Sequence, residues 1–281
     1  SLRVAVMLLI DKQTRGRHGN KVFHFNTLMQ LSELIGQDCS TDHWDSYEMF
    51  EQTCKLNEST NGTEIPPDHL IYKSHDELKK LYSSGDWKLN TYSLCGPFFR
   101  LSLRDPRDFI KLKSKPTLLS DGVKVGIHIR GGDTRGADGM NCREIHPPEY
   151  YINAINFVMD EFDGDVTFYL CTDDPDPNFP SYEKTLNHLI SIKASLYHDP
   201  SNHYMKDFSI LTECDVLISG SSTFATAAGM IGKHKKIIHS KEFVEQFKDE
   251  DQKWYSNFGN GMFFYDLNHK KSDYYNLWRL I

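Results

Sequence analysis

The segment HIRGGD, residues 128–133, places a cation and two glycines directly after an apolar run. The planar fork of an arginine can hold two oxygens of a phosphate group at once. Glycines allow the backbone to come close to a ligand or to adopt a positive φ. Arg130, Gly131 and Gly132 are therefore typical of a loop that binds a diphosphate. The alternative is a surface salt bridge between Arg130 and Asp133 or Asp138.

A second segment, GSSTFATAAGMIG at residues 220–232, sets small hydroxyl residues in front of an apolar helical pattern. The first N–H groups of a helix lack partners within the helix and carry partial positive charge, so a phosphate is stabilised there. Ser221, Ser222 and Thr223 would add hydroxyl donors. The alternative is ordinary N-capping of the helix by Ser222 or Thr223.

The elements that must position these residues alternate regularly from about residue 119. Strands are expected at residues 123–130, 166–172, 194–198, 215–219 and 237–239. Helices are expected after Pro147-Pro148, near 182–190, around 205–214 and from 223. Strands that alternate with helices of this length predict a parallel, doubly wound sheet. The ligand of such a sheet lies outside the carboxyl ends of the strands, where Arg130, Asp173 and Ser222 fall.

Residues 1–118 show a similar but less regular order, with an apolar run at 4–10, a loop rich in Gly and Arg, and a helix from about 21 to 34. The loop contains Gly16 and Gly19 but lacks the GxGxxG spacing, so a dinucleotide fingerprint is not supported. We expect two α/β domains, 1–118 and 119–281, whose glycine-containing loops face each other across a cleft.

Charge and composition argue against several classes of protein. The 281 residues include 32 basic and 39 acidic side chains, a formal charge of −7, which disfavours a dedicated nucleic-acid or membrane-surface binder. The longest purely apolar run is too short to span a bilayer, so no membrane insertion is expected. An anchor or leader removed from a longer product stays open. The compartment is not indicated, although we favour the cytoplasm over the secretory lumen.

The six cysteines form no CxxC pair, which favours buried thiols over metal ligands or a full set of disulfides. Cys171 and Cys214 lie in or beside apolar, strand-like runs, where a thiol packs as a small apolar side chain. Two sequons, Asn57-Glu-Ser and Asn61-Gly-Thr, would matter only in a secretory compartment.

Four segments together resemble one known group of enzymes. HIRGGD resembles the HxRxGD motif of the inverting α-1,2-, α-1,6- and protein O-fucosyltransferase superfamily. GRHGNKVFHF, residues 16–25, is similar to the GRxGNQxxHF motif of protein O-fucosyltransferases and to the GNQ motif of α-1,2-fucosyltransferases. FYLCTDDP at 168–175 and DFSILTECDVLISGSSTFATAAG at 207–229 resemble the two remaining motifs. The matches span most of the chain in the order of the family.

The resemblance implies a GT-B type fold, in which two Rossmann-like domains face each other across a cleft. It implies GDP-fucose as the donor, bound to the C-terminal domain, with no metal and no further cofactor. The implied reaction is a direct displacement that inverts the sugar carbon. The hydroxyl of a glycan or of a protein-linked sugar would be the acceptor.

The resemblance also implies roles for individual residues. Arg130 would bind the β-phosphate and stabilise the charge of the departing GDP, and Asn20 would reach the donor from the opposite domain. The residues implied to bind the donor are Arg17, Gly19, His128, Asp173, Asp207, Ser221, Ser222 and Thr223. Asp207 would accept N1–H and N2–H of guanine, which suits a carboxylate because it can accept two parallel N–H bonds. Without the resemblance, Asp207 is equally consistent with a solvated acid on a helix.

The general base is not singled out by the sequence. Positions near the expected loops are Asp11, His18, Glu48 and Asp133. His18 is attractive as a catalytic residue because an imidazole titrates near neutral pH and can take a hydroxyl proton. A loop histidine in water is the alternative.

The sequence departs from the family at three positions. His18 and Lys21 replace the commoner Phe or Leu and Gln, and Gly131 stands where many members have a second Arg. The loss of that Arg puts the full neutralisation of the diphosphate in question. Another donor, UDP-xylose or GDP-mannose, and a non-catalytic nucleotide- or carbohydrate-binding module therefore remain as alternatives.

Asp173 and Asp174 have a further interpretation, as the metal-binding DxD of the other large glycosyltransferase fold. Carboxylates at a strand end suit Mg²⁺ or Mn²⁺. That fold has no use for an HxRxGD strand tip or for a phosphate site at a helix start, so we expect no metal. A P-loop kinase or an NAD enzyme is disfavoured because neither fingerprint is present.

Overall fold

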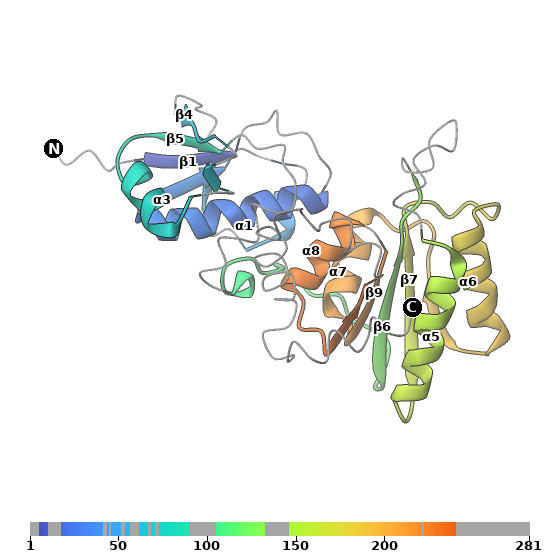
Figure 1. Ribbon diagram of the computed structural model, residues 1–281. Helices are drawn as coiled ribbons and strands as arrows, with labels where there is room; N and C mark the ends of the chain where they lie inside the picture. The colour runs from blue at the N-terminus through green and yellow to red at the C-terminus, as the bar shows by residue number, and fades with distance from the viewer. Residues whose placement is uncertain are drawn as a thin grey trace. The chain divides into compact units, whose positions relative to one another are not determined.

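The computed structural model describes residues 6–10, 18–41, 44, 46–51, 54–56, 62–66, 69–70, 73–89, 105–132, 146–220 and 222–239. Among these, the residues up to Lys113 form one compact unit and those from Ser114 onward form a second. Each unit is described by itself, and Figure 1 labels the elements of both. Asp11, Arg17, Asp133 and Ser221 lie outside the described part of the chain. Within the described ranges, every helix is too short or too polar for a bilayer crossing.

The first unit contains a five-stranded parallel sheet with the strand order β3-β2-β1-β5-β4. Its strands are β1 (Val6–Ile10), β2 (Asp38–Thr41), β3 (Lys55–Leu56), β4 (Thr63–Glu64) and β5 (Trp87–Leu89). Its helices are α1 (His18–Ile35) and α3 (His75–Tyr82), with 3₁₀ turns η1 (Tyr47–Met49) and η2 (Pro106–Asp108). Helix α1 packs on β1 and β2 and completely buries Val22, Phe23 and Leu28. It is therefore an apolar support of this sheet.

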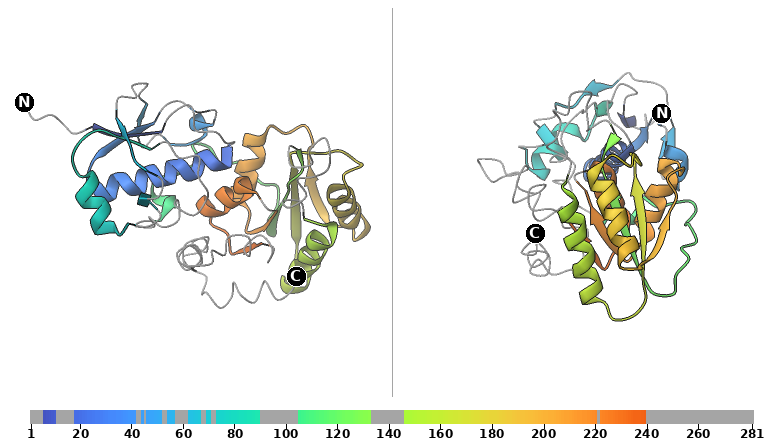
Figure 2. Two further views of the ribbon diagram at one scale, coloured as in Figure 1. Left: turned by 45° about the horizontal axis from the view of Figure 1, so that its top comes forward. Right: turned by 90° about the vertical axis from the view of Figure 1, so that its right-hand side faces the viewer.

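The second unit contains a five-stranded parallel sheet in the order β10-β9-β6-β7-β8. Its strands are β6 (Val123–Ile129), β7 (Val166–Thr172), β8 (Ser195–His198), β9 (Val216–Ser219) and β10 (Lys236–Ile238). Its helices are α5 (Pro148–Glu161), α6 (Pro180–Ser191), α7 (Tyr204–Glu213) and α8 (Thr223–Ile231). Helices α5 and α6 cover one face of the sheet, and α7 and α8 cover the other (Figure 1, Figure 2). Strands covered on both faces are nearly continuous apolar runs, which is why the sequence revealed them.

This architecture confirms the predicted α/β fold with parallel sheets. Some strand bounds differ by one residue from the expected ones. Strand β6 ends at Ile129, so Arg130 is the first residue beyond the sheet, and β9 begins at Val216. The larger correction concerns α1, which begins at His18 rather than near residue 21. His18 and the two residues after it therefore belong to the first helical turn and not to the preceding loop.

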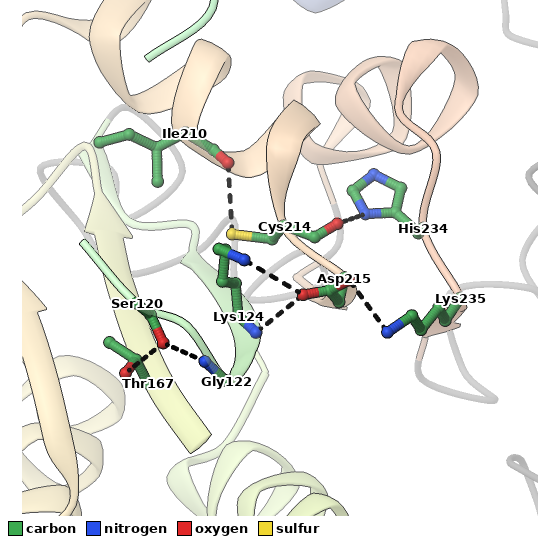
Figure 3. A network of polar contacts seen from close by, with 9 residues as sticks. All are labelled: Ser120, Gly122, Lys124, Thr167, Ile210, Cys214, Asp215, His234 and Lys235. Atoms are coloured by element: carbon green, nitrogen blue, oxygen red, sulfur yellow. Dashed lines mark hydrogen bonds and ion pairs between the residues drawn. The ribbon is translucent and has the colours of Figure 1, made fainter. Parts of the chain in front are cut away.

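Polar contacts tie together the amino ends of the strands in the second unit (Figure 3). Asp215, just before β9, accepts a hydrogen bond from the backbone N–H of Lys124 at 3.0 Å and pairs with Nζ of Lys235 at 3.2 Å. The N–H of Asp215 donates to the carbonyl oxygen of Lys124 at 2.8 Å. One aspartate thus connects the starts of β6, β9 and β10, at the edge opposite the carboxyl ends.

We expect Asp215→Ala to lower the free energy of unfolding by about 1–3 kcal/mol, because a partly buried backbone donor loses its acceptor. Lys235→Ala is the matched control, since its side chain is 62% exposed and an exposed ion pair contributes at most about 1 kcal/mol. Urea denaturation at neutral pH measures both variants. Equal losses in the two variants would contradict the structural role of the aspartate.

Candidate functional site

The carboxyl ends of β6 and β7 are joined by an ion pair and two backbone hydrogen bonds. Nη1 of Arg130 lies 2.6 Å from Oδ2 of Asp173. The N–H of Gly131 donates to Oδ1 of Asp173 at 2.8 Å, and the N–H of Gly132 donates to Oδ2 of Asp174 at 3.2 Å. Both oxygens of Asp173 are therefore engaged in holding the loop after β6, a geometry that suits a positioning role.

The two glycines are required by this close approach. Gly132 has a φ of +46°, and a Cβ there would lie 2.7 Å from Oδ2 of Asp173. A Cβ at Gly131 would lie 2.5 Å from Cβ of Asp174. The predicted positive φ is confirmed at Gly132. The groups that come close to the glycines in this structure are the side chains of Asp173, Asp174 and Phe179.

The start of helix α8 lies beside this loop because β9 pairs with β6 in parallel. Ser222 is the N-cap of α8, and its hydroxyl accepts a hydrogen bond from the N–H of Phe224 at 3.2 Å. The alternative of ordinary N-capping is therefore confirmed for Ser222, while Thr223 is the first helical residue. The predicted phosphate contact stays a prediction. A hydroxyl that accepts this bond still carries a hydrogen that it can donate to an anion.

Two adjacent tyrosines of α5 hold the strand ends in place, a role that the sequence did not reveal. Oη of Tyr150 lies 2.9 Å from the carbonyl oxygen of Ser219 and 3.0 Å from that of Ile238, so it links β9 to β10. The hydroxyl of Tyr151 is hydrogen-bonded to the backbone of Arg130, and burial raises its pKa. The available signal was the Tyr-Tyr pair at residues 150–151, one residue after Pro148 at the start of the expected helix.

Gly220 fits between these groups only because it lacks a side chain. A Cβ there would lie 2.8 Å from Oη of Tyr151 and 2.9 Å from the carbonyl oxygen of His128. We expect Gly220→Ala to destabilise the protein by about 1–3 kcal/mol in urea denaturation. Adding Tyr151→Phe removes one of the two clashing oxygens, so the double variant should lose less than the sum of the single variants. A Gly220→Ala protein as stable as the wild type would show that the site tolerates a side chain.

His128 is a buried, neutral imidazole at the end of β6. It is 3% exposed, and its ring lies 5.1 Å from that of Phe224, centroid to centroid. Burial lowers the pKa of His128 to about 4, against the opposing effect of Asp173. Its Nδ1 atom has no hydrogen-bond partner among the residues that the structure describes. The predicted nucleotide contact of His128 stays a prediction, and this ring nitrogen is the atom that it would use.

Asp207 lies in the first turn of α7 and is buried, so the alternative of a solvated helix acid is wrong. It is 7% exposed and accepts a hydrogen bond from Nδ2 of Asn202 at 3.0 Å. The Cys171 thiol also bonds to it, yet burial dominates and raises the pKa of Asp207 to about 6. The carboxylate is thus ionised at neutral pH at a cost in free energy.

His18 does not fit either expectation made for it, because it is neither an imidazole that titrates near neutral pH nor a loop residue in water. It is 7% exposed, with the rings of Trp44 and Phe50 around it. Burial lowers the pKa of His18 to about 3. Such an imidazole is a weak base. Glu48, another predicted base, is an exposed partner of Lys113 at 3.1 Å.

The predicted site residues divide between the two units. The second unit brings together His128, Arg130, Asp173, Asp207, Ser222 and Thr223 at or near the carboxyl ends of its strands. His18, Gly19 and Asn20 start α1 of the first unit. In the described ranges, no cluster of three or more His, Cys, Asp or Glu side chains is arranged to hold a metal ion.

Comparison with known proteins defines the class of fold. No family model matches the sequence, and no curated protein matches it at a significant level. Solved structures do match, and they define the fold as the GT-B type found in fucosyltransferases.

Three of these structures illustrate the match. NodZ α-1,6-fucosyltransferase soaked with GDP-fucose is 16% identical over 83% of this chain and 94% of its own, with a TM-score of 0.50. POFUT1 in complex with GDP-fucose is 8% identical over 84% and 98%, with a TM-score of 0.53. A mutant of Arabidopsis thaliana FUT1 in complex with GDP is 13% identical over 84% and 70%, with a TM-score of 0.52. At these identities the likeness is one of fold.

Proposed function

We propose that this protein is an inverting glycosyltransferase that moves L-fucose from GDP-fucose to a hydroxyl of a glycan or of a protein-linked sugar, without a metal ion. The observation that carries the proposal is the position of Arg130, held by Asp173 beside the start of α8. This arrangement lies at the carboxyl ends of parallel strands, where ligands of such sheets bind. One matching fold has been solved in complex with GDP-fucose and another after soaking with GDP-fucose.

The diphosphate would bind between Arg130 and the N-terminus of α8. The guanidinium of Arg130 would exchange a carboxylate oxygen of Asp173 for phosphate oxygens, which have the same charge sign and geometry. Ser221, Ser222 and Thr223 would donate hydroxyl or backbone hydrogens from the helix start. Negative charge grows on the β-phosphate as the bond to the sugar breaks, and Arg130 stabilises that charge.

Asp207 would select the guanine base. Its ionised carboxylate accepts N1–H and N2–H together, a pair of parallel donors that uracil does not offer. His128 would contact the nucleotide through its neutral imidazole. From the first unit, Asn20, with Arg17 and Gly19, would complete donor binding.

The acceptor hydroxyl attacks the anomeric carbon through a state with oxocarbenium character while GDP departs. His18 is unsuited to the role of general base, because burial lowers its pKa to about 3. We propose no side chain among the described residues as the general base that takes the proton of the acceptor hydroxyl.

Thermal shift with nucleotides tests the donor. We expect GDP and GDP-fucose to raise the Tm in the presence of EDTA, while UDP leaves it unchanged, because a ligand bound only to the native state stabilises it. At a concentration about 100 times Kd the gain is about 2.7 kcal/mol. A shift with UDP or UDP-xylose alone would indicate another donor. Slow release of fucose from GDP-fucose in the absence of an acceptor would indicate an enzyme rather than a non-catalytic binding module.

A further inference from the structure

Two cysteines of the first unit lie next to each other on neighbouring strands. Strands β2 and β3 pair in parallel, with Ser40 opposite Lys55 and Thr41 opposite Leu56. Cys39 lies on β2 one residue before Ser40, and Cys54 directly precedes β3, so the same register continued by one residue would place the two cysteines side by side. Their thiols are in hydrogen-bonding contact. Neighbouring strands lie about 4.8 Å apart, which is within the range of roughly 4.4–6.8 Å that a disulfide requires between Cα atoms.

We propose that Cys39 and Cys54 form a disulfide that ties the edge strand β3 to β2. Strand β3 is two residues long and stands at the end of the sheet, where β2 is its neighbour among the strands that the structure describes. A pair of strands this short contributes little by backbone hydrogen bonds alone. A covalent link at its amino end would hold the edge in register.

Both cysteines are held from their other sides, so little rearrangement is needed. Cys39 is paired with Leu8 of β1, and its Sγ lies 3.5 Å from Sδ of Met29 in α1. The hydroxyl of Tyr47 donates to the carbonyl oxygen of Cys54 at 2.7 Å. Both side chains are partly exposed, so a small oxidant can reach them.

Cys39 is the sulfur that reacts first. The Cys54 thiol lowers the pKa of Cys39, and the Ser32 hydroxyl adds to this effect against the burial that raises it. The Cys39 thiolate attacks one sulfur of a small-molecule disulfide, such as oxidised glutathione, and releases one thiol. Cys54 then attacks the sulfur of Cys39 and releases the second thiol. Two protein thiols are oxidised, one external disulfide is reduced to two thiols, and their protons pass to the released thiolates.

Such a bond is typical of proteins that fold in an oxidising compartment, so this proposal favours the secretory lumen over the cytoplasm, the compartment favoured from the sequence alone. The sequence places the sequons at Asn57 and Asn61 shortly after Cys54, and these are substrates for glycosylation only in a secretory compartment. The Cys39–Cys54 disulfide is independent of the proposed function, because it lies at the sheet edge of the first unit alone.

Peptide mapping of the full chain tests the proposal. The protein is equilibrated with oxidised and reduced glutathione, its free thiols are alkylated, and the proteolytic peptides are analysed by mass spectrometry. We expect one linked peptide that contains Cys39 and Cys54, while Cys171 and Cys214, which are buried, are alkylated only after unfolding. Alkylation of both Cys39 and Cys54 in excess oxidised glutathione would overturn the proposal. So would separate glutathione adducts, or a link from either to Cys95 or Cys142.

Thermal unfolding gives a second, independent readout. Oxidation should raise the Tm of the wild type by on the order of 5 °C, because closing the loop restricts the unfolded chain. Cys39→Ser and Cys54→Ser should each lose this difference between oxidised and reduced protein, whereas the matched control Cys214→Ser should retain it. If the two serine variants kept the difference, the link would have to lie elsewhere.

Discussion

Replacing Arg130 with alanine is expected to lower the rate of the proposed fucose transfer by about 10²–10³-fold. A donor aimed at charge that develops in the transition state contributes about this much. The segment HIRGGD has one arginine where the motif that it resembles often has two. The rate falls because the leaving GDP loses the cation on its β-phosphate. Steady-state kinetics with GDP-fucose measures the effect, and kcat should fall more than KM rises.

Two further variants make this result specific. Arg130→Lys keeps the charge but loses the planar fork that holds two oxygens, so its rate should fall between those of the alanine variant and the wild type. Lys235→Ala removes a cation from the opposite edge of the same sheet and should leave the rate unchanged. The alanine variant should still fold, because Asp173 keeps its bond from the N–H of Gly131. A folded Arg130→Ala protein with wild-type kcat would contradict the leaving-group role.

Replacing Asp207 with asparagine is expected to have opposite effects on binding and on stability. The GDP affinity should fall by about 10–100-fold, because the amide offers guanine one acceptor and one donor in place of two acceptors. Isothermal titration calorimetry at neutral pH measures this loss. UDP binding, if any, should not change.

The same substitution should stabilise the ligand-free protein above pH 6. The pKa of Asp207 is raised from 3.8 to about 6 by burial, so the ionised form is less stable in the folded protein than in the unfolded chain. The cost is absent below about pH 4, grows between the two pKa values, and is complete above about pH 6. It amounts to about 3 kcal/mol. Asp207→Asn should therefore gain up to this amount at pH 8 and nothing at pH 4.

The pH dependence of GDP binding follows from the same shift. Protonation of Asp207 below about pH 6 removes one acceptor, so wild-type affinity should fall by up to about tenfold per pH unit. The phosphates of GDP also titrate in this range. Asp207→Asn is the control, because the pH dependence of its GDP affinity comes from the phosphates and not from residue 207. Identical pH profiles for the two proteins would rule out Asp207 as the guanine acceptor.

The functional edge of the second unit was predictable because its signals are local. Apolar runs that alternate with helical patterns predicted the parallel sheet, and the residues after each run are necessarily at its carboxyl ends. Arg130, Asp173 and Ser222 could therefore be assigned to one edge from sequence alone. The capping role of Ser222 depends only on its own helix, and it too was among the predictions.

The partners across that edge were not predictable, because they depend on register and packing between distant segments. Asp173 had a predicted role in donor binding, yet its oxygens hold Arg130 and Gly131. The hydroxyls of Tyr150 and Tyr151 reach the strand ends only because α5 packs on that face.

The sequence by itself determined the order of strands and helices and the residue types at the strand ends, since periodicity and local turn chemistry encode both. Only the tertiary structure decided which side chains are removed from water. Burial converts Asp207 into an acid with a raised pKa and His18 into a weak base. The pairing of β2 with β3 brings Cys54, which directly precedes β3, close to Cys39 of β2. Desolvation and long-range pairing depend on the packing of segments far apart in the chain, which no local pattern specifies.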